Sequence, residues 1–110
     1  NYTAFSDQKL KENIVDANSQ WDDIKSIQIR NFNFKEETGL PTHTQIGVIA
    51  QELEQICPNL VKDVKVTNDG EDTYKTVKSS ILYMKTVKAL QEAMERIETL
   101  EAKVASLENP

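Results

Sequence analysis

The residues of this 110-residue chain that could do chemistry are concentrated in a polar segment near its amino terminus, Ser6 to Ile14. A serine hydroxyl becomes a useful nucleophile only when a base removes its proton, and a lysine can be that base only while it is neutral. Burial or a nearby positive charge lowers the pKa of a lysine in this way. Taken alone, however, such a string is more typical of a polar surface turn, with Leu10 and Ile14 as its apolar anchors.

The other reactive side chains are isolated. The single histidine, His43, falls in a loop over 36–43, where an exposed residue is more common than a proton-transfer group. The single cysteine, Cys57, lies between Ile56 and Pro58, which predicts a buried small hydrophobic residue and not a reactive thiol. Because no second histidine and no cysteine pair accompany them, we expect no metal site and no small-molecule cofactor.

Composition restricts the class of partner. Thirteen basic and eighteen acidic residues leave a formal net charge of −5, which argues against nucleic acid or anionic lipid as the main partner. Trp21, Phe32 and Phe34 are therefore expected in a core or a subunit interface, not as stacking platforms. No run approaches the roughly 18 apolar residues of a membrane span. The first five residues do not resemble a signal peptide, and a chain that starts without Met is expected to be part of a longer protein.

The body of the chain predicts short elements of both kinds, and hence an α+β fold. In order, these are a two-turn helix over 18–27, a strand over 27–34, a strand over 45–50, a helix over 51–57 ended by Pro58, and a hairpin of strands 60–66 and 73–77. Asn18 or Ser19 is suited to cap the first helix. In the first strand, Ile27 and Ile29 alternate on one face, whereas Phe32 and Phe34 fall on the other. A bulge near Arg30 and Asn31 would bring all four side chains to the same face. The sequence Asn68-Asp69-Gly70 predicts the hairpin turn.

The last part of the chain predicts one long helix, from about Ile81 to Glu108, with Ser79 or Ser80 as its cap. Its early apolar residues, Ile81, Leu82, Met84 and Val87, are expected to pack on the body. Beyond them an apolar seam follows a heptad repeat. Its a positions are Leu90, Ile97 and Val104, and its d positions are Ala93, Leu100 and Leu107.

A heptad seam of this kind favours packing against identical helices. In a parallel bundle its flanking charges also attract, since Arg96 would meet Glu101 and Lys103 would meet Glu108 of a neighbouring chain. Two alternatives stay open: the stripe could pack on its own domain, and these a and d residues are compatible with a dimer as well as a trimer.

Two blocks of the sequence resemble a known family. Ser6-Asp7-Gln8-Lys9-Leu10-Lys11-Glu12-Asn13-Ile14 resembles the opening motif of the C-terminal intramolecular chaperone domain of phage tail spikes and tail fibres, the peptidase S74 family. Gly47-Val48-Ile49-Ala50-Gln51-Glu52-Leu53, followed by Pro58 and Leu60-Val61, resembles its second block. The coiled-coil tail completes the pattern in the same order, so the resemblance covers nearly the whole chain.

The resemblance implies a homotrimer with a parallel coiled coil at its carboxyl end. Such a domain assembles the preceding fibre in the host cell cytoplasm during virion assembly, and then releases itself by serine-type autoproteolysis. The positions that match the family's serine and lysine are Ser6 and Lys11. Their spacing of five residues requires a bend or a neighbouring chain to bring Nζ within about 3 Å of Oγ. From its position, Asp7 could orient the lysine or strain the turn, and His43 could assist proton transfer. Gln51 and Glu52, in the second block, could contact the cleavage region or the fibre end, although Glu52 in the first turn of a helix is also suited to interact with the helix dipole.

The resemblance also predicts how the chain is divided. Residues 1–5 would be the end of the upstream fibre protein, 6–80 the α+β chaperone body, and 81–110 the helix with the seam. The scissile bond would be adjacent to Ser6, on a side that the sequence does not identify. Two other functions are compatible with the same residues: a trimerisation module without catalysis, and a receptor-binding tip. In the first of these, Ser6 and Lys11 would be ordinary surface residues.

Overall fold

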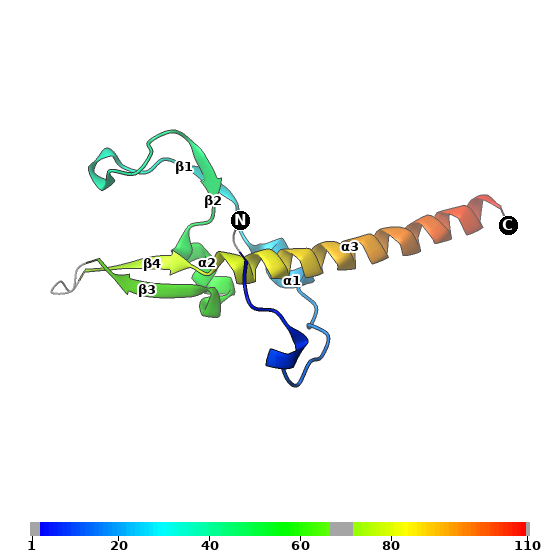
Figure 1. The fold of residues 1–110 in the computed structure, drawn as a ribbon. Helices are drawn as coiled ribbons and strands as arrows, with labels where there is room; N and C mark the ends of the chain where they lie inside the picture. The colour runs from blue at the N-terminus through cyan, green and yellow to red at the C-terminus, as the bar shows by residue number, and fades with distance from the viewer. Residues whose placement is uncertain (1–2, 67–71, 110) are drawn as a thin grey trace.

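A long helix projecting from a small body dominates the computed structural model, which describes residues 3–66 and 72–109. The helix, α3 (Ser79–Glu108), has 30 residues, so it is about 45 Å long at 1.5 Å per residue. Figure 1 shows its first turns against the body and its carboxyl end far from every other element. The molecule is elongated accordingly, with principal extents of 70 × 40 × 30 Å.

The body combines short helices and short strands, which confirms the predicted α+β class. Along the chain the elements before α3 are η1 (Gln8–Leu10), α1 (Trp21–Ser26), β1 (Arg30–Phe32), η2 (Glu36–Thr38), β2 (Gln45–Gly47), α2 (Ala50–Ile56), η3 (Pro58–Leu60), β3 (Val61–Lys65) and β4 (Thr73–Val77), where η denotes a 3-10 helix.

The first antiparallel pair, β1 with β2, is shorter and more regular than the sequence predicted. Arg30 pairs with Gly47, Asn31 with Ile46 and Phe32 with Gln45, one residue against one. A strand is thus confirmed within the predicted range 27–34, but it is shorter than predicted, and the predicted bulge near Arg30 and Asn31 is wrong. No bulge is needed, because Ile27 packs on the core before the strand begins. Its side chain therefore need not lie on the same face of the sheet as that of Phe32.

The second pair, β3 with β4, is the predicted antiparallel hairpin, in register from Val61 opposite Val77 to Lys65 opposite Thr73. Its predicted turn, Asn68-Asp69-Gly70, lies outside the described residues. Lys75 ties the hairpin to α2, because its Nζ lies 3.1 Å from a carboxylate oxygen of Glu54 and 3.1 Å from one of Asp63. Hydrogen bonds to these two acids, first of all Glu54, raise the pKa of Lys75.

A small hydrophobic core lies where α2, η3 and the start of α3 meet. Leu53, Cys57 and Leu60 are buried, and the partly buried residues packed against them are Ile27, Val48, Ile56, Val61, Val77 and Leu82. Pro58 ends α2, as predicted, and begins η3. Cys57 is 7% exposed, which confirms the prediction of a buried small residue, and burial raises the pKa of its thiol.

The start of α3 differs from the prediction in two respects. The helix begins at Ser79, and its cap position is Lys78, which makes no side-chain capping hydrogen bond within the described part of the chain, so neither Ser79 nor Ser80 is the cap. Leu82 packs on the core, but Ile81 and Met84 are exposed. Only one face of the first turns meets the body, because the body has few elements with which to surround the helix.

Candidate active site

Ser6 and Lys11 lie together at the amino-terminal end of the chain. The Nζ atom of Lys11 donates a hydrogen bond of 2.7 Å to the Oγ atom of Ser6. The bend that brings them together is η1, a single 3-10 turn in which Leu10 N–H donates to Asp7 C=O and Lys11 N–H donates to Gln8 C=O. Asp7 stabilises this turn, because its Oδ1 accepts a hydrogen bond from the Lys9 N–H.

The arrangement places an amine and a hydroxyl at the separation that proton transfer needs. Both side chains are exposed in the single chain. A lysine can take the proton of a serine only in its neutral form, which burial away from water favours. The hydrogen bond agrees with the predicted pairing of Ser6 and Lys11, and their catalytic roles stay predictions.

The segment that carries this pair stands apart from the body. Every residue from Thr3 to Ser19 is exposed, and Phe5 is 94% exposed. Asn13, with φ of 55°, is the one described non-glycine residue in the left-handed region, which asparagine tolerates better than most residues. Figure 1 shows the segment, in blue, as a separate arm below α3. We call residues 3–18 the amino-terminal arm.

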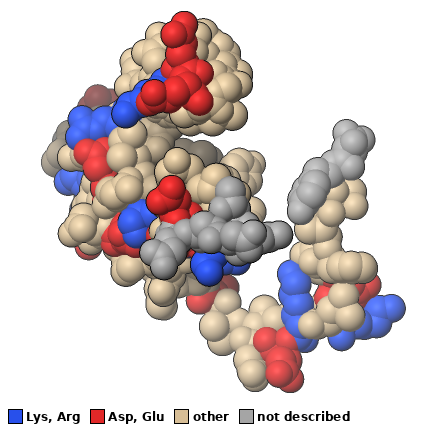
Figure 2. Space-filling view, turned by 90° about the vertical axis from the view of Figure 1, so that its left-hand side faces the viewer, with Lys and Arg blue, Asp and Glu red and all other residues tan. Residues whose placement is uncertain are grey.

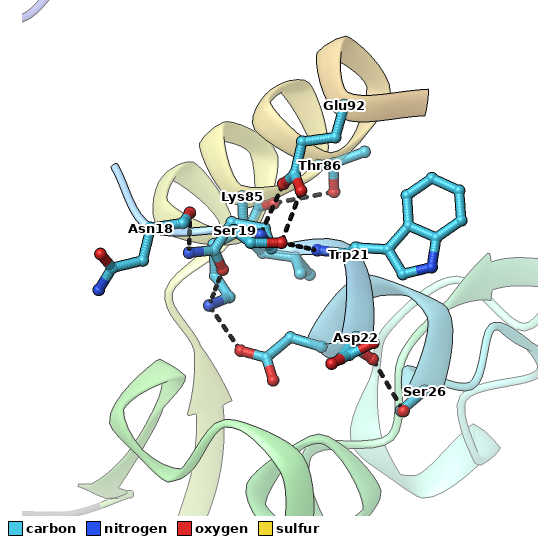
Figure 3. Close-up of polar contacts among 11 residues, drawn as sticks. Asn18, Ser19, Trp21, Asp22, Ser26, Lys85, Thr86 and Glu92 are labelled. Atoms are coloured by element: carbon cyan, nitrogen blue, oxygen red, sulfur yellow. Dashed lines mark hydrogen bonds and ion pairs between the residues drawn. The ribbon is translucent and has the colours of Figure 1, made fainter. Parts of the chain in front are cut away.

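The arm ends at an anchor on α3 that sequence reasoning missed. Glu92 accepts a hydrogen bond of 2.5 Å from Ser19 Oγ and one of 2.7 Å from the Gln20 N–H (Figure 3). These bonds, led by the one from Ser19, lower the pKa of the Glu92 carboxyl. Asn18 or Ser19 is the predicted cap of the first helix. The Oγ atom of Ser19 does accept a long contact of 3.4 Å from the Trp21 N–H, but the residue at the cap position is Gln20, so the predicted cap is wrong.

Two further contacts fasten α1 to α3. Lys85 donates from Nζ to the side-chain oxygen of Gln20 and to Asp23 Oδ2, the latter at 3.1 Å. The guanidinium of Arg96 lies over the ring of Trp21, 3.6 Å from its centroid, a cation–π contact. The arm is thus attached to α3 at a fixed place, close to the first heptad of the seam.

The second predicted block runs from the end of β2 into α2, and its Glu52 takes part in a different contact. Arg30 of β1 donates two hydrogen bonds to the Glu52 carboxylate, one of 3.0 Å from Nε and one of 2.7 Å from Nη2. These bonds lower the pKa of Glu52 and raise that of Arg30. Gln51, beside it, is exposed. Glu52 therefore joins β1 to α2, whereas contact between this block and the Ser6–Lys11 pair stays a prediction.

His43 lies in the connection between η2 and β2 and is exposed. Asn33 holds this connection, because its Nδ2 donates to the Thr42 C=O at 2.7 Å. In Figure 1 the loop between β1 and β2 is above α3 and the amino-terminal arm is below it. The fold of one chain thus brings Ser6, Asp7 and Lys11 together and leaves His43 elsewhere.

The predicted seam is largely uncovered in the single chain. Leu90, Ile97, Leu100, Val104 and Leu107 are between 52% and 81% exposed, and Ala93 is partly buried against α1. An exposed apolar stripe of this length is a surface that favours a partner. The exposure agrees with an intermolecular seam; the number and direction of the helices stay predictions.

The remaining surface carries charges of both signs. On the face in Figure 2, Lys and Arg are interspersed with Asp and Glu, without one continuous basic area. Among the described residues there is no helix both long and apolar enough to cross a membrane. The same residues contain no group of three or more His, Cys, Asp or Glu side chains placed to hold a metal ion.

The fold and the site define a small α+β domain with an exposed helical seam and a serine–lysine pair on an amino-terminal arm. The model of the family described as chaperone of endosialidase, Peptidase_S74, matches residues 6–62, slightly more than half of the chain. The chain therefore belongs to this family, which confirms the resemblance.

A probable tail fiber protein of Escherichia phage Phieco32 is similar to nearly the whole chain. The two are 31% identical over 104 residues, which are 91% of this chain and 14% of the phage protein. The chain thus spans only a small part of the length of that relative.

Proposed function

We propose that this chain is a trimeric intramolecular chaperone that assembles the preceding part of a phage tail fibre and then releases itself by cutting next to Ser6. Family membership and the similarity to a tail fibre protein support the chaperone role. The exposed heptad seam supports assembly through α3. The single observation that carries the proposed cleavage is the 2.7 Å hydrogen bond between Lys11 Nζ and Ser6 Oγ.

The chaperone action follows from parallel association. Three α3 helices that pair in register place three copies of the upstream polypeptide side by side. Each copy is then present at a high effective concentration near the others. An intertwined fibre depends on contacts that are distant in sequence and slow to form, so this proximity lowers the entropic cost of its nucleation. The assembly would take place in the host cell cytoplasm, where the fibre is made.

The proposed cut is at the bond between Phe5 and Ser6. Neutral Lys11 accepts the proton of Ser6 Oγ, which attacks the carbonyl carbon of Phe5. The Ser6 nitrogen takes a proton and leaves that carbon, so an ester to Oγ replaces the amide. Water then hydrolyses the ester, giving a carboxylate on Phe5 and a free amine on Ser6. We favour this bond because the Phe5 carbonyl is the acyl group directly attached to Ser6, within reach of its own hydroxyl.

Assembly would activate this reaction. The amino-terminal arm is exposed in one chain, so the Lys11 amine is hydrated there. A neighbouring protomer or the folded fibre that covers the arm would desolvate the amine and favour its neutral form. Cleavage would then follow assembly and would not precede it. Once the chaperone domain that aligns the three chains is lost, the fibre would be kinetically trapped in its assembled state. An uncut Ser6→Ala fibre should therefore unfold and refold more reversibly than the cut one.

The test is expression of the chain with its natural upstream segment. We expect self-cleavage in the wild type, no cleavage in Ser6→Ala or Lys11→Ala, and wild-type cleavage in Lys9→Ala. Lys9 is the matched control, because it lies in the same turn and contributes its backbone N–H, not its side chain, to the Asp7 contact.

The cleavage products are identified by mass spectrometry and amino-terminal sequencing. A new terminus at Ser6 supports the proposed bond, and a terminus at Asp7 would place the cut on the other side. An assembled wild type that stays uncut would contradict the catalytic part and favour a purely structural trimerisation module. Binding of the isolated domain to host receptors would favour a receptor-binding tip.

A further inference from the structure

A groove runs between α1 and α3 at the beginning of the coiled-coil seam. Its volume is about 360 Å³, and its lining is mostly apolar: Trp21, Ile24, Lys25, Thr86, Ala89, Leu90 and Ala93. Leu90 and Ala93 are also the first a and d residues of the predicted seam. The groove is therefore continuous with the surface through which we propose that the chains assemble.

The heptad repeat identifies what would face this groove. With Leu90 at a and Ala93 at d, Ala89 is at a g position and Met94 at an e position. In a parallel coiled coil, a g residue meets the e residue five positions later on the neighbouring helix. Ala89 would thus face Met94 of the neighbour. Ala89 is 7% exposed and short, while Met94 is 51% exposed in the single chain.

We propose that Met94 of a neighbouring copy occupies this groove, so that α1 takes part in the trimer interface. The proposal rests on the proposed parallel assembly and names a contact within it. Methionine suits the groove because its unbranched side chain adapts to irregular apolar space and its sulfur packs favourably against aromatic rings. Trp21 supplies that ring, and Arg96 over the ring together with the Glu92 anchor holds α1 in place.

The contact would also fix the register of the helices. The e positions of the seam are Met94, Glu101 and Glu108, and the g positions are Ala89, Arg96 and Lys103. When the helices are in register, the groove receives Met94 of the neighbour. The two later g–e pairs, Arg96 with Glu101 and Lys103 with Glu108, are then oppositely charged. A shift of one heptad that brings Glu101 to the groove would desolvate a carboxylate among apolar groups, which is strongly unfavourable. The groove therefore acts against that alternative pairing.

Disulfide trapping tests the geometry directly. In a Cys57→Ala background, Ala89→Cys combined with Met94→Cys is expected to form covalent oligomers up to the trimer under mild oxidation. The control pair is Ala89→Cys with Glu95→Cys, because residue 95 is at an outward f position next to Met94. This control is expected to form few links or none. Equal linking of the two pairs would overturn the proposed contact.

Fluorescence provides an independent test without any change at the buried Ala89. Trp21 is the only tryptophan of the chain, so its emission reports on the groove. We expect its emission to move to shorter wavelength on assembly, and Met94→Ala to reduce this shift and weaken assembly roughly tenfold. Met84→Ala is the matched control, since Met84 is 59% exposed and at an outward b position.

Solution mass separates failure of this inference from failure of the proposed function. A trimer without the 89–94 link, and with Trp21 emission unaffected by Met94→Ala, would overturn the groove contact and leave assembly intact. A monomer at all concentrations would overturn both. A trimer with the link and with the loss of emission shift confined to Met94→Ala would support both.

Discussion

The carboxylate of Asp7 accepts a hydrogen bond of 2.8 Å from the backbone N–H of Lys9. This contact caps the 3-10 turn that brings Lys11 to Ser6. The structure thus gives Asp7 a local role: it holds the bend, and its side chain is directed to the backbone. The role of Asp7 in the proposed cleavage follows from this position.

Replacement of Asp7 should slow the proposed self-cleavage through the turn. A capping side chain contributes about 1 kcal/mol, so Asp7→Ala should lower the population of the closed turn, and the cleavage rate, roughly fivefold. Asp7→Asn keeps an oxygen able to accept from the Lys9 N–H and should keep most of the rate. Time courses of cleavage on the chain with its upstream segment measure this. An equal loss in both variants would show that the charge of Asp7, not its cap, matters.

A charge in the seam should abolish assembly. Ile97 is at a central a position and 55% exposed in the single chain, so Ile97→Asp would bury a carboxylate in each helix of a bundle. We expect a monomer by light scattering, with the body still folded by circular dichroism and cleavage lost. Gln91→Asp adds the same charge at an outward b position and should assemble normally. Normal assembly of Ile97→Asp would contradict the seam.

The ion pair between Arg30 and Glu52 should make stability depend on pH. Its hydrogen bonds lower the pKa of Glu52 in the folded state below the ordinary value of 4.5. The stabilisation is therefore complete above the pKa of the unfolded carboxyl and is lost as the pH falls through the lower folded pKa. Wild type should be more stable than Glu52→Gln at neutral pH, and the difference should close on acidification.

Urea unfolding at a series of pH values measures this difference. The matched control is Glu37→Gln in the exposed turn η2, which removes a carboxylate of the same type outside this ion pair. A difference between wild type and Glu52→Gln that stays constant down to the acid range would contradict the assignment of this pair.

The small core should be sensitive to truncation at Leu53, which is 1% exposed. Leu53→Ala removes buried contacts between α2, η3 and α3 and should lower the free energy of unfolding by about 2–5 kcal/mol. Ile46→Ala is the control, because Ile46 is an aliphatic residue of β2 that is 75% exposed. Chemical denaturation at fixed protein concentration measures both variants. Similar losses in the two would show that the core lies elsewhere.

Local patterns in the sequence predicted most of the elements. The second hairpin, the helix ended by Pro58 and the long last helix each depend on interactions between residues close in the chain, so their signals are local. The boundaries were less well predicted. The bulge at Arg30 and the serine caps of α3 were wrong, because Ile27 packs on the core and Lys78 is held by its N–H bond to the Leu60 C=O.

By itself, the sequence determined the family resemblance, the α+β class and the heptad seam, since motifs and periodicity are properties of the order of residues. Only the tertiary structure decided that Glu92 anchors Ser19, that Arg96 lies over Trp21 and that Glu52 pairs with Arg30. Each of these contacts joins residues more than 20 positions apart. Many alternative charged or aromatic partners fit at such separations, and the packing of α1 and α2 selects among them.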